Sequence, residues 1–426
     1  MPSRPPKNPL KVIFINRYFF PDQSATSQML SDLSFGLAQR GFSVHVLCSR
    51  QLYTQASASL APLEAVNGVM VHRVWTTRFG RDRLAGRALD YISFYLSSAW
   101  VLAKMLKRGD TVVAKTDPPL ISIVAMAATK ARGAHLLNWL QDIFPEVASR
   151  LGNNPLPRRV DDLVRKLRDS TLRAANMNVV LGGRMREFLE RQGIPAEKIC
   201  VIENWADGDA VVPIGVADSA LRARLGLAGK FVVGYSGNLG RAHEFDTLLD
   251  AASLLSKDED IAFLMIGGGV GMSVLQREVS RRGLDNFHFL PHQPRACLSD
   301  CMAAADVHWV SLLPSLEGLI VPSKLYGILA AGRPVIFVGD PDGEVARQIG
   351  PAQAGMAVGV GDARELQRQI VDLKSDYRRR ESMGKNGYQL YRDRFTPQRA
   401  LARWSDILRP PTPGAPPEPP SSGTSV

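Results

Sequence analysis

The stretch KVIFINRYFFPDQSATSQMLSDLSFGLAQRGFSVHVLC, residues 11–48, contains a complete strand–loop–helix–strand unit. It begins with the β-branched and aromatic run Lys11–Ile15 and continues through a polar loop. Three leucines then recur at helical spacing until Gly41 ends the helix, and Val44–Cys48 returns as a second strand. Because a helix between two strands is the crossover unit of a parallel sheet, this stretch predicts an α/β fold.

Apolar strand-like runs continue to alternate with helical patterns on both sides of one turn-rich interruption, ADGDAVVPIGVADS at residues 206–219. Two series of this kind predict two doubly wound, Rossmann-like parallel sheets that face each other. The predicted units are an N-terminal domain over 1–205, a linker over 206–228, a C-terminal domain over 229–390, a helix over 391–409 that packs back on the N-terminal domain, and a disordered Pro-rich tail over 410–426. The remaining strands are predicted at Val69–Val74, Thr111–Ala114, His135–Trp139, Asn178–Leu181, Phe231–Ser236, Ala262–Ile266, Phe287–Leu290, Val307–Ser311 and Val335–Val338.

Composition indicates an ordinary globular protein rather than a membrane-spanning or disulfide-stabilised one. Of the 426 residues, 45% are hydrophobic and 22% are charged, and four cysteines are too few for a disulfide framework. Cys297 and Cys301 are close in sequence but lack a second Cys or His pair, so we expect no metal site. The apolar run Val12–Ile15 is broken by Asn16 and Arg17, and no eighteen apolar residues run together, so we expect a cytoplasmic protein.

The formal net charge of +11 favours a partner that carries negative charge: a phosphate-bearing substrate, an anionic lipid surface or a nucleic acid. There is no Cys/His finger, aromatic-rich RNA-binding signature or Lys/Arg run, so we expect no nucleic-acid partner. Between Arg78 and Arg108, seven Lys/Arg and two Asp surround the segment DYISFYLSSAWVLAKML. This pattern is typical of a helix on an anionic membrane surface, and equally of a core helix with a solvated basic flank.

Glycine-rich loops follow two of the predicted C-terminal strands, and open parallel sheets bind ligands beyond such strand ends. In YSGNLGRAHEF, Gly237 and Gly240 allow the backbone to approach a ligand, while Arg241 and His243 are able to reach anionic oxygens. In FLMIGGG, Gly267–Gly269 have no side chains to block a ligand. Each loop, taken alone, is equally consistent with a tight strand-to-helix turn that binds nothing.

A third C-terminal motif, LIVPSKLYGILAAG, has Pro322 and Ser323 at a predicted helix start and Lys324 in the first turn. A lysine there is unfavourable because its charge opposes the positive end of the helix dipole. A diphosphate bound at the helix start removes this conflict, so we predict an anion site around Lys324. The alternative is a solvated lysine on an exposed helix start.

In the N-terminal half, the loop PDQSATSQ connects the first strand to its helix and is rich in small polar residues, which predicts contact with a substrate through Ser24 and Thr26. Asp142 and Glu146 closely follow the strand His135–Trp139 in NWLQDIFPE. Either carboxylate would serve to orient or deprotonate an acceptor hydroxyl. Helix capping is the competing explanation for Asp142.

Six motifs, in this order and at sensible distances, carry a family resemblance: FFPDQSATSQMLSDLSFGLAQRGFSVHVLCS, NWLQDIFPEV, ICVIENWAD, YSGNLGRAHEF, FLMIGGG and VPSKLYGILAAGRPVI. The sequence resembles the retaining glycosyltransferases of family 4, also called group 1, which have the GT-B fold. It is most similar to bacterial members that build cell-surface polysaccharide on lipid carriers. The resemblance covers nearly all of residues 11–408.

The resemblance implies a nucleotide-sugar donor on the C-terminal domain, UDP rather than GDP, and an acceptor linked to polyprenyl diphosphate on the N-terminal domain. It implies retention of anomeric configuration without a required metal or other cofactor, and peripheral attachment to the cytoplasmic face of the inner membrane. The predicted catalytic residues are Asp142, Arg241 and Lys324, the last two neutralising the leaving diphosphate. The predicted donor-binding residues are Gly237, Asn238, Gly240, His243, Gly268, Gly269, Ser323 and Glu344, and the predicted acceptor-binding residues are Ser24, Thr26 and Glu146.

The sequence departs from the family pattern in its charged residues. Asn238 and His243 stand where family members typically carry an Arg and a Lys, and Arg241 is the candidate substitute. The family's paired glutamates fall on Leu319 and Gly327 in an ungapped alignment, with Glu317 just upstream and Glu344 just downstream.

Glu344 follows a predicted strand, so it is placed either to accept hydrogen bonds from a ribose or to cap a helix. Asp340 and Asp342 in GDPDGE have the spacing of a metal-binding pair, but the Pro-Gly context favours a turn. Two alternative functions therefore stay open: a sugar-nucleotide epimerase of the same fold, and a non-catalytic nucleotide-sugar-binding protein without the paired glutamates.

Overall fold

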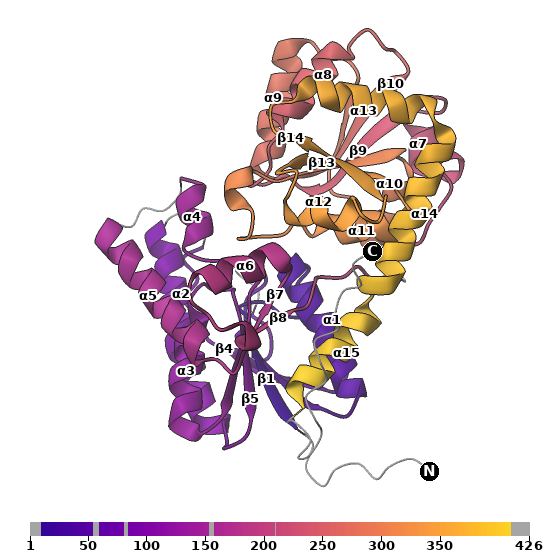
Figure 1. Cartoon of the computed structure of the whole chain (residues 1–426). Coiled ribbons are helices and arrows are strands. Elements are labelled where there is room, and N and C mark those ends of the chain that lie inside the picture. The colour runs from indigo at the N-terminus through magenta and orange to yellow at the C-terminus, as the bar shows by residue number, and fades with distance from the viewer. Residues whose placement is uncertain (1–9, 54–58, 81–83, 153–156, 209, 410–426) are drawn as a thin grey trace, which may run out of the picture.

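The computed structural model describes residues 10–53, 59–80, 84–152, 157–208 and 210–409, and it contains two parallel sheets, each flanked by helices (Figure 1). The expected tail over 410–426 lies outside these residues. The two stacked α/β units confirm the predicted pair of Rossmann-like sheets.

The N-terminal sheet has the strand order β3-β4-β2-β1-β5-β6-β7-β8, in which only the β3–β4 pair is antiparallel. Its strands are β1 Lys11–Ile15, β2 Ser43–Ser49, β3 Leu63–Val66, β4 Val69–Val74, β5 Thr111–Lys115, β6 His135–Trp139, β7 Met177–Val180 and β8 Ile199–Val201. Its helices are α1 Ala25–Gln39, α2 Leu84–Met105, α3 Ile121–Arg132, α4 Glu146–Arg150, α5 Arg158–Ala174 and α6 Gly183–Arg191. Every N-terminal strand that the sequence predicted is present, to within one residue at either end.

The C-terminal sheet is parallel throughout, with the order β11-β10-β9-β12-β13-β14. Its strands are β9 Phe231–Asn238, β10 Ile261–Gly268, β11 Phe287–Leu290, β12 Val307–Ser311, β13 Val335–Gly339 and β14 Gly355–Gly359. The helices around it are α7 Ala220–Arg224, α8 Asp246–Leu254, α9 Val270–Arg282, α10 Leu298–Ala303, α11 Lys324–Ala330, α12 Glu344–Ile349 and α13 Ala363–Ser375. The chain order reverses between β9 and β12, which is where ligands bind in open α/β sheets.

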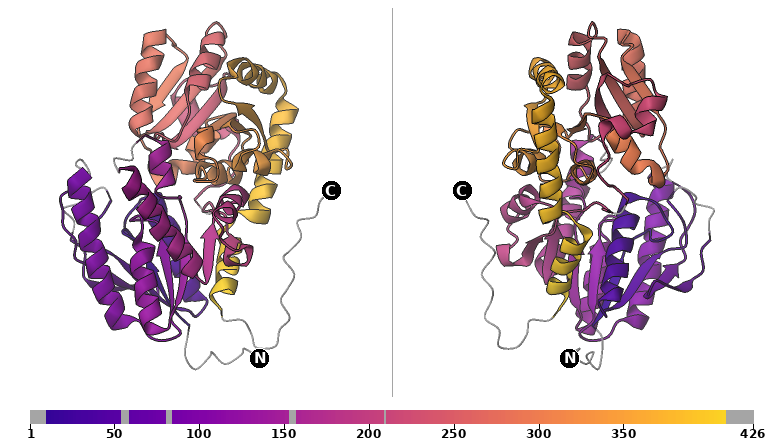
Figure 2. Two further views of the ribbon diagram at one scale, coloured as in Figure 1. Left: turned by 60° about the vertical axis from the view of Figure 1, so that its left-hand side comes forward. Right: turned by 90° about the vertical axis from the view of Figure 1, so that its right-hand side faces the viewer.

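Two C-terminal helices, α14 Tyr377–Arg394 and α15 Pro397–Leu408, run along both units and end on the N-terminal one (Figure 2). The ring of Trp404 in α15 is buried 4.9 Å from the ring of Trp139 and 6.3 Å from that of Phe14. Ser405 accepts a hydrogen bond from Arg40 at 3.0 Å. The last helix therefore completes the core beneath the N-terminal sheet and ties the two units together.

Three strands were not predicted: β3, β8 and β14. Each lies at the edge of its sheet, and β3 and β8 have only four and three residues. The side chains of β3 are almost all exposed, and β14 begins and ends with glycine, so neither has the buried β-branched run that identifies a central strand.

Candidate functional site

Lys324 lies at the carboxyl edge of the C-terminal sheet, beside the loop that follows β9. Its Nζ donates a hydrogen bond to His243 Nε2 at 3.2 Å and lies 5.2 Å from the centre of the Tyr235 ring. The other ring nitrogen of His243, Nδ1, is 2.8 Å from the carbonyl oxygen of Ser311. Because that carbonyl only accepts, Nδ1 carries the proton and Nε2 is free to accept from the ammonium group.

Burial shifts the ionisation of both members of this pair. Desolvation lowers the pKa of Lys324 to about 8. Desolvation and the neighbouring ammonium lower the pKa of His243 to about 4, so the imidazole is neutral. In the part of the chain that the structure describes, no carboxylate forms a salt bridge with Lys324. The site therefore holds a desolvated cation, which favours an incoming anion.

The two glycine-rich segments begin inside the paired strands β9 and β10, next to this lysine, because both strands run two residues further than the sequence predicted. Gly237 has φ +137°, and a Cβ there would lie 2.7 Å from Lys324 Cε. Gly267 has φ +131°, and its Cβ would lie 1.9 Å from the carbonyl oxygen of Gly237. Leu239 N donates to Gly268 O at 2.7 Å, which joins the loops. Glycine is therefore required here by the lysine and by the pairing of β9 with β10, before any ligand is considered.

The other predicted donor residues surround this edge. Asn238 is the last residue of β9 and its side chain is exposed, while Gly240 and the exposed side chain of Arg241 belong to the loop that follows. A Cβ on Gly269 would lie 2.5 Å from Asn238 Oδ1, so the two predicted loops meet at that point. Ser323 has helical dihedral angles and makes no side-chain cap, so α11 begins without a conventional N-cap bond. The approach of Arg241 and Ser323 to a diphosphate stays a prediction.

Asp142 lies where the two domains touch. It forms a β-bridge with Ile320, and Ile143 N donates to Leu319 O at 2.9 Å, so its segment pairs with the loop that leads to Lys324. Burial raises the pKa of Asp142, and a hydrogen bond with Thr116 opposes that rise. Its Oδ1 is buried and makes no hydrogen bond with any described residue. A carboxylate with raised pKa and an unused acceptor oxygen is able to accept a proton or a hydrogen bond, and the role of Asp142 towards an acceptor stays a prediction.

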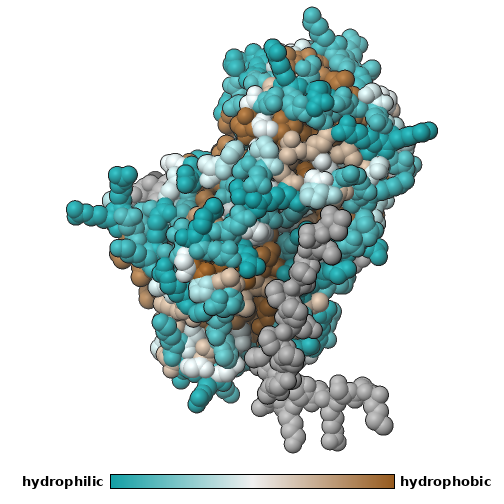
Figure 3. All heavy atoms as spheres, in the orientation of Figure 1, coloured by the Kyte–Doolittle hydropathy of each residue, from teal (hydrophilic) through white to brown (hydrophobic). Residues whose placement is uncertain are grey.

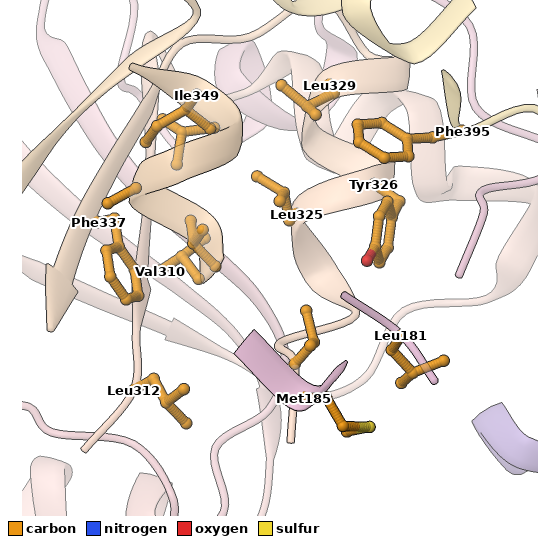
Figure 4. Close-up of a cluster of buried hydrophobic side chains, with 14 of the residues drawn as sticks. Leu181, Met185, Val310, Leu312, Leu325, Tyr326, Leu329, Phe337, Ile349 and Phe395 are labelled. Atoms are coloured by element: carbon orange, nitrogen blue, oxygen red, sulfur yellow. The ribbon is translucent and has the colours of Figure 1, made fainter. Parts of the chain in front are cut away.

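Buried apolar side chains hold this interdomain contact in place. Figure 4 shows Leu181 and Met185 of the N-terminal domain on the side of α11 that carries Leu325 and Tyr326. The cluster continues from α11 to Phe395, which follows α14. The helix that begins with Lys324 is therefore fixed by packing from both domains.

Glu146, the second predicted carboxylate of the N-terminal domain, is engaged by arginines. Arg168 donates to both of its oxygens, at 2.7 and 3.0 Å, and Arg165 forms a salt bridge at 2.6 Å. Both oxygens of this carboxylate are therefore already engaged by guanidinium groups. Its contact with an acceptor stays a prediction, but any such contact has to share the carboxylate with two guanidinium groups.

Glu317 and Glu344, 27 residues apart in sequence, are brought together. Glu344 N donates to Glu317 Oε2 at 3.1 Å. Burial is the main cause that raises the pKa of Glu317 to about 7, and Glu317 Oε1 has no partner among the described residues. Glu344 itself is buried and accepts from Arg184 N at 2.8 Å, so it caps the first turn of α6 in the other domain. Ribose binding by Glu344 stays a prediction, and this interdomain bond was not foreseen.

Asp340 and Asp342 occupy a turn, as their Pro-Gly context indicated. Asp342 N donates to Asp340 Oδ1 at 2.9 Å, which closes an Asx-type turn. Both carboxylates already have arginine partners, Arg184 at 3.4 Å for Asp340 and Arg347 at 2.8 Å for Asp342.

Lys115 at the end of β5 was missed by the sequence reasoning. It is fully buried, its Nζ donates to Thr26 O at 2.7 Å, and that Nζ lies 3.9 Å from the centre of the Trp139 ring. Burial lowers its pKa to about 7, against the attraction of Asp117. Thr26 and Ser24 are partly exposed at the start of α1. A lysine at the end of a buried strand was the available signal, and it positions the predicted acceptor loop.

Two family descriptions match the sequence and together span most of both domains. Residues 25–205 match the family described as "Glycosyl transferase 4-like domain". Residues 218–390 match the family described as "Glycosyl transferases group 1".

Individual relatives and solved structures agree with these matches. A probable glycosyltransferase, WbjE of Pseudomonas aeruginosa, is 27% identical over 296 residues, 70% of this chain and 74% of that protein. A putative colanic acid biosynthesis glycosyl transferase, WcaI of Escherichia coli, is 28% identical over 254 residues, 58% of this chain and 61% of that protein. Two solved structures share the fold. Sucrose-phosphate synthase from Thermosynechococcus elongatus has TM-score 0.73 at 16% identity, covering 93% of this chain and 98% of its own. Anabaena HepE in complex with UDP has TM-score 0.69 at 16% identity, covering 94% of this chain and 99% of its own. A third, WaaG, is described as a glycosyltransferase involved in lipopolysaccharide biosynthesis and has TM-score 0.66 at 15% identity, covering 93% of this chain and 99% of its own.

Proposed function

Because this chain belongs to the group 1 glycosyltransferases and has their GT-B fold, we propose that it transfers a sugar from a nucleoside-diphosphate sugar bound by its C-terminal domain. The acceptor is presented by the N-terminal domain, and the reaction takes place where the two domains meet.

The observation that carries the proposal is the ammonium group of Lys324. It is half-buried beside Gly237, its hydrogen-bond partner is a neutral imidazole, and burial has already lowered its pKa. A diphosphate bound over the two glycine loops supplies the missing negative charge. As the bond to the sugar breaks, charge grows on the leaving diphosphate, and a preorganised cation stabilises it more than it stabilises the ground state.

The acceptor side is assigned to the N-terminal elements that face this edge. Asp142 has a raised pKa and pairs through its backbone with Ile320, four residues before Lys324. We assign it to the acceptor hydroxyl, which it orients and whose proton it accepts. The loop of Ser24 and Thr26, anchored by Lys115, presents the rest of the acceptor.

The finer assignments rest on the family and on what the relatives are named for. HepE is described in complexes with UDP and with UDP-glucose, which supports a UDP-sugar donor here. WcaI and WaaG are named for colanic acid and lipopolysaccharide synthesis, which supports a surface polysaccharide with a polyprenyl-diphosphate-linked acceptor. Retention of configuration without a required metal, and peripheral attachment to the cytoplasmic membrane face, complete the proposal.

A thermal-shift screen of nucleoside diphosphates and their sugars tests the donor site, because a specific ligand stabilises the folded protein by mass action. We expect UDP and one UDP-sugar to raise the melting temperature, and Lys324→Met to reduce that rise strongly. Arg347→Met serves as the control, since Arg347 forms ion pairs with Glu187 and Asp342 rather than with this edge. An unchanged shift in the Lys324 variant would remove the lysine from the site.

Incubation of the donor without acceptor separates transfer from epimerisation. A glycosyltransferase leaves the donor sugar unchanged apart from slow hydrolysis, whereas an epimerase converts it to a second nucleotide sugar. Donor binding without turnover on any lipid-linked acceptor would instead indicate a binding protein.

A further inference from the structure

The outward face of α2 is more apolar than a solvated helix surface. The residues that α2 buries against the N-terminal sheet recur every four positions and include two polar ones: Asp90, Phe94, Ser98 and Leu102. The opposite face carries exposed apolar side chains at helical spacing, here called the outer strip: Leu89, Ile92, Leu96 and Trp100. Leu96 is 68% exposed and Trp100 is 64% exposed. Large side chains so exposed, in one continuous row, mark an interaction surface.

A groove of about 600 Å³ extends the outer strip toward β3 and β4. Leu96 and Trp100 line one side of it, and Leu63 of β3 and Trp75, which follows β4, line the other. Trp75 is 61% exposed, and Phe79 further along the same loop is also exposed. In Figure 3, brown hydrophobic surface is visible at the left-hand edge of the N-terminal domain, where α5 and α2 overlap in the view of Figure 1, and α5 also carries exposed apolar side chains.

The charges around the outer strip are positive. Exposed cations flank it before, within and after α2: Arg78, Arg87, Lys104, Lys107 and Arg108. The ammonium group of Lys104 lies 4.1 Å from the centre of the Trp100 ring. Across the described residues 75–80 and 84–108 the one carboxylate is Asp90, which is buried and paired with Arg17 at 3.3 Å.

We propose that the outer strip and its groove dock the enzyme on an anionic lipid bilayer, with Trp75 and Trp100 at the headgroup level and Leu96 below them. Tryptophan is favoured at that depth because its ring is apolar and its N–H is polar. The flanking cations attract anionic headgroups. No helix in the described ranges is long and apolar enough to cross a membrane. Because α2 packs its other face on the N-terminal sheet, the proposal has it lie in the surface plane with the outer strip towards the bilayer.

A second copy of the chain is a weaker candidate for the occupant. In a symmetric dimer the same face meets itself, so the cations that flank the strip would face each other. Among the described residues beside the groove, the exposed carboxylate Glu64 is already paired with Arg73 at 2.5 Å. A bilayer with anionic headgroups complements both features at once.

The docking proposal rests on the proposed function, because it names the surface through which the proposed peripheral attachment takes place. Trp75 and Phe79 lie in the loop that leaves the carboxyl end of β4, and parallel neighbours of β4 end at the same edge of the sheet. The acceptor loop at Ser24 and Thr26 leaves β1 at that edge too. Docking through the outer strip therefore brings the acceptor loop to the membrane, where a lipid-linked acceptor resides.

Vesicle sedimentation tests the proposal without substrate, so its result is independent of the transfer reaction. We expect the full chain to bind vesicles of phosphatidylcholine with phosphatidylglycerol, and to bind pure phosphatidylcholine vesicles at least tenfold more weakly. The double variant Leu96→Gln/Trp100→Gln should lose at least tenfold in partitioning. Leu254→Gln, which changes a 50% exposed leucine at the end of α8 in the other domain, should partition like the parent.

Equal partitioning of the double variant and the parent, or no preference for the anionic vesicles, overturns the proposal. A parent that is dimeric in solution, with a double variant that is monomeric, assigns the face to a second copy and overturns it as well. A UDP-induced thermal shift of parental size in the double variant confirms that it is folded. If that shift is absent in the parent too, the donor assignment fails while the vesicle result still stands.

Discussion

We predict that the protein takes up protons when it binds a diphosphate, and that the pKa of Lys324 determines the number taken up. The pKa of Lys324 is lowered from 10.5 to about 8 by burial, so in the free protein the amine is half neutral near pH 8. A bound diphosphate favours the charged form and returns the pKa toward its ordinary value. If that recovery is complete, binding takes up about 0.1 proton at pH 7, about 0.5 at pH 8 and about 0.9 at pH 9. The recovered shift corresponds to about 3 kcal/mol.

The sign of the pH effect on affinity follows directly. Because only the charged amine binds the anion well, the affinity for UDP falls about tenfold for each pH unit between 8 and 10.5. Groups near the lysine do not compensate: His243 has its pKa lowered to about 4 and stays neutral throughout. The terminal phosphate of UDP, with a second pKa near 6, is already fully ionised above pH 8.

Calorimetry at pH 9 measures the uptake, when UDP is titrated in two buffers with different ionisation enthalpies. The difference in heat gives the number of protons bound. Lys324→Arg should bind UDP with no uptake, since a guanidinium group stays charged at this pH. UDP binding by the parent without any buffer-dependent heat, or equal uptake by Lys324→Met, would refute the assignment.

Three further substitutions test the surroundings of the site. Gly267→Ala places a Cβ 1.9 Å from the carbonyl oxygen of Gly237 in the paired strand, at φ +131°, so it should lower the free energy of unfolding by about 2 kcal/mol or more. Gly359→Ala, which has open space around the new Cβ, should not lower it. Chemical denaturation measures both. Glu317→Gln should raise the free energy of unfolding by up to about 3 kcal/mol over the parent at pH 8 and by little at pH 4. The reason is that burial raises the pKa of Glu317 from 4.5 to about 7, so the parent loses the stability of the protonated form as the pH rises through 7. Equal gains at both pH values in urea titrations would contradict this. Glu344→Ala removes the carboxylate that caps α6, which should lower the free energy of unfolding by about 1 to 2 kcal/mol and speed hydrogen exchange of the Arg184 amide. Unchanged exchange would show that the hydrogen bond from Arg184 to Glu344 does not hold the domains together.

The fold could be predicted from the sequence because each central strand has a recognisable local sequence pattern. β1 and β9 are apolar, β-branched runs followed by glycine or polar loops, and that pattern depends only on neighbouring residues. The edge strands β3 and β14 lack it, since pairing on one side requires less burial, and β8 has an apolar run of the right kind but only three residues in the strand.

The candidate site was predictable only in part, for a physical reason. The glycines and Lys324 are recognisable from the local sequence. The glycines lack a side chain, and the lysine stands at an unfavourable position in the first turn of a helix. The hydrogen bond from Lys324 to His243 joins residues 81 positions apart, and the bond between Glu317 and Glu344 joins residues 27 positions apart. No periodicity or motif specifies such pairs, because they arise when separate loops meet at one edge of the folded sheet.

The two halves of the site differ in what completes them. The contacts of Lys324 with Tyr235, Gly237 and His243 all lie within the C-terminal domain, so its desolvated charge exists whether or not the N-terminal domain is close. Asp142, in contrast, reaches this edge through its bridge to Ile320, which forms only when the domains touch. The donor side is therefore complete in one domain, while the acceptor side depends on the interdomain contact. For the proposed assignments, this division predicts that the diphosphate binds first and that Asp142 joins Lys324 only when the domains touch, which would keep water from the donor until the acceptor hydroxyl is in place.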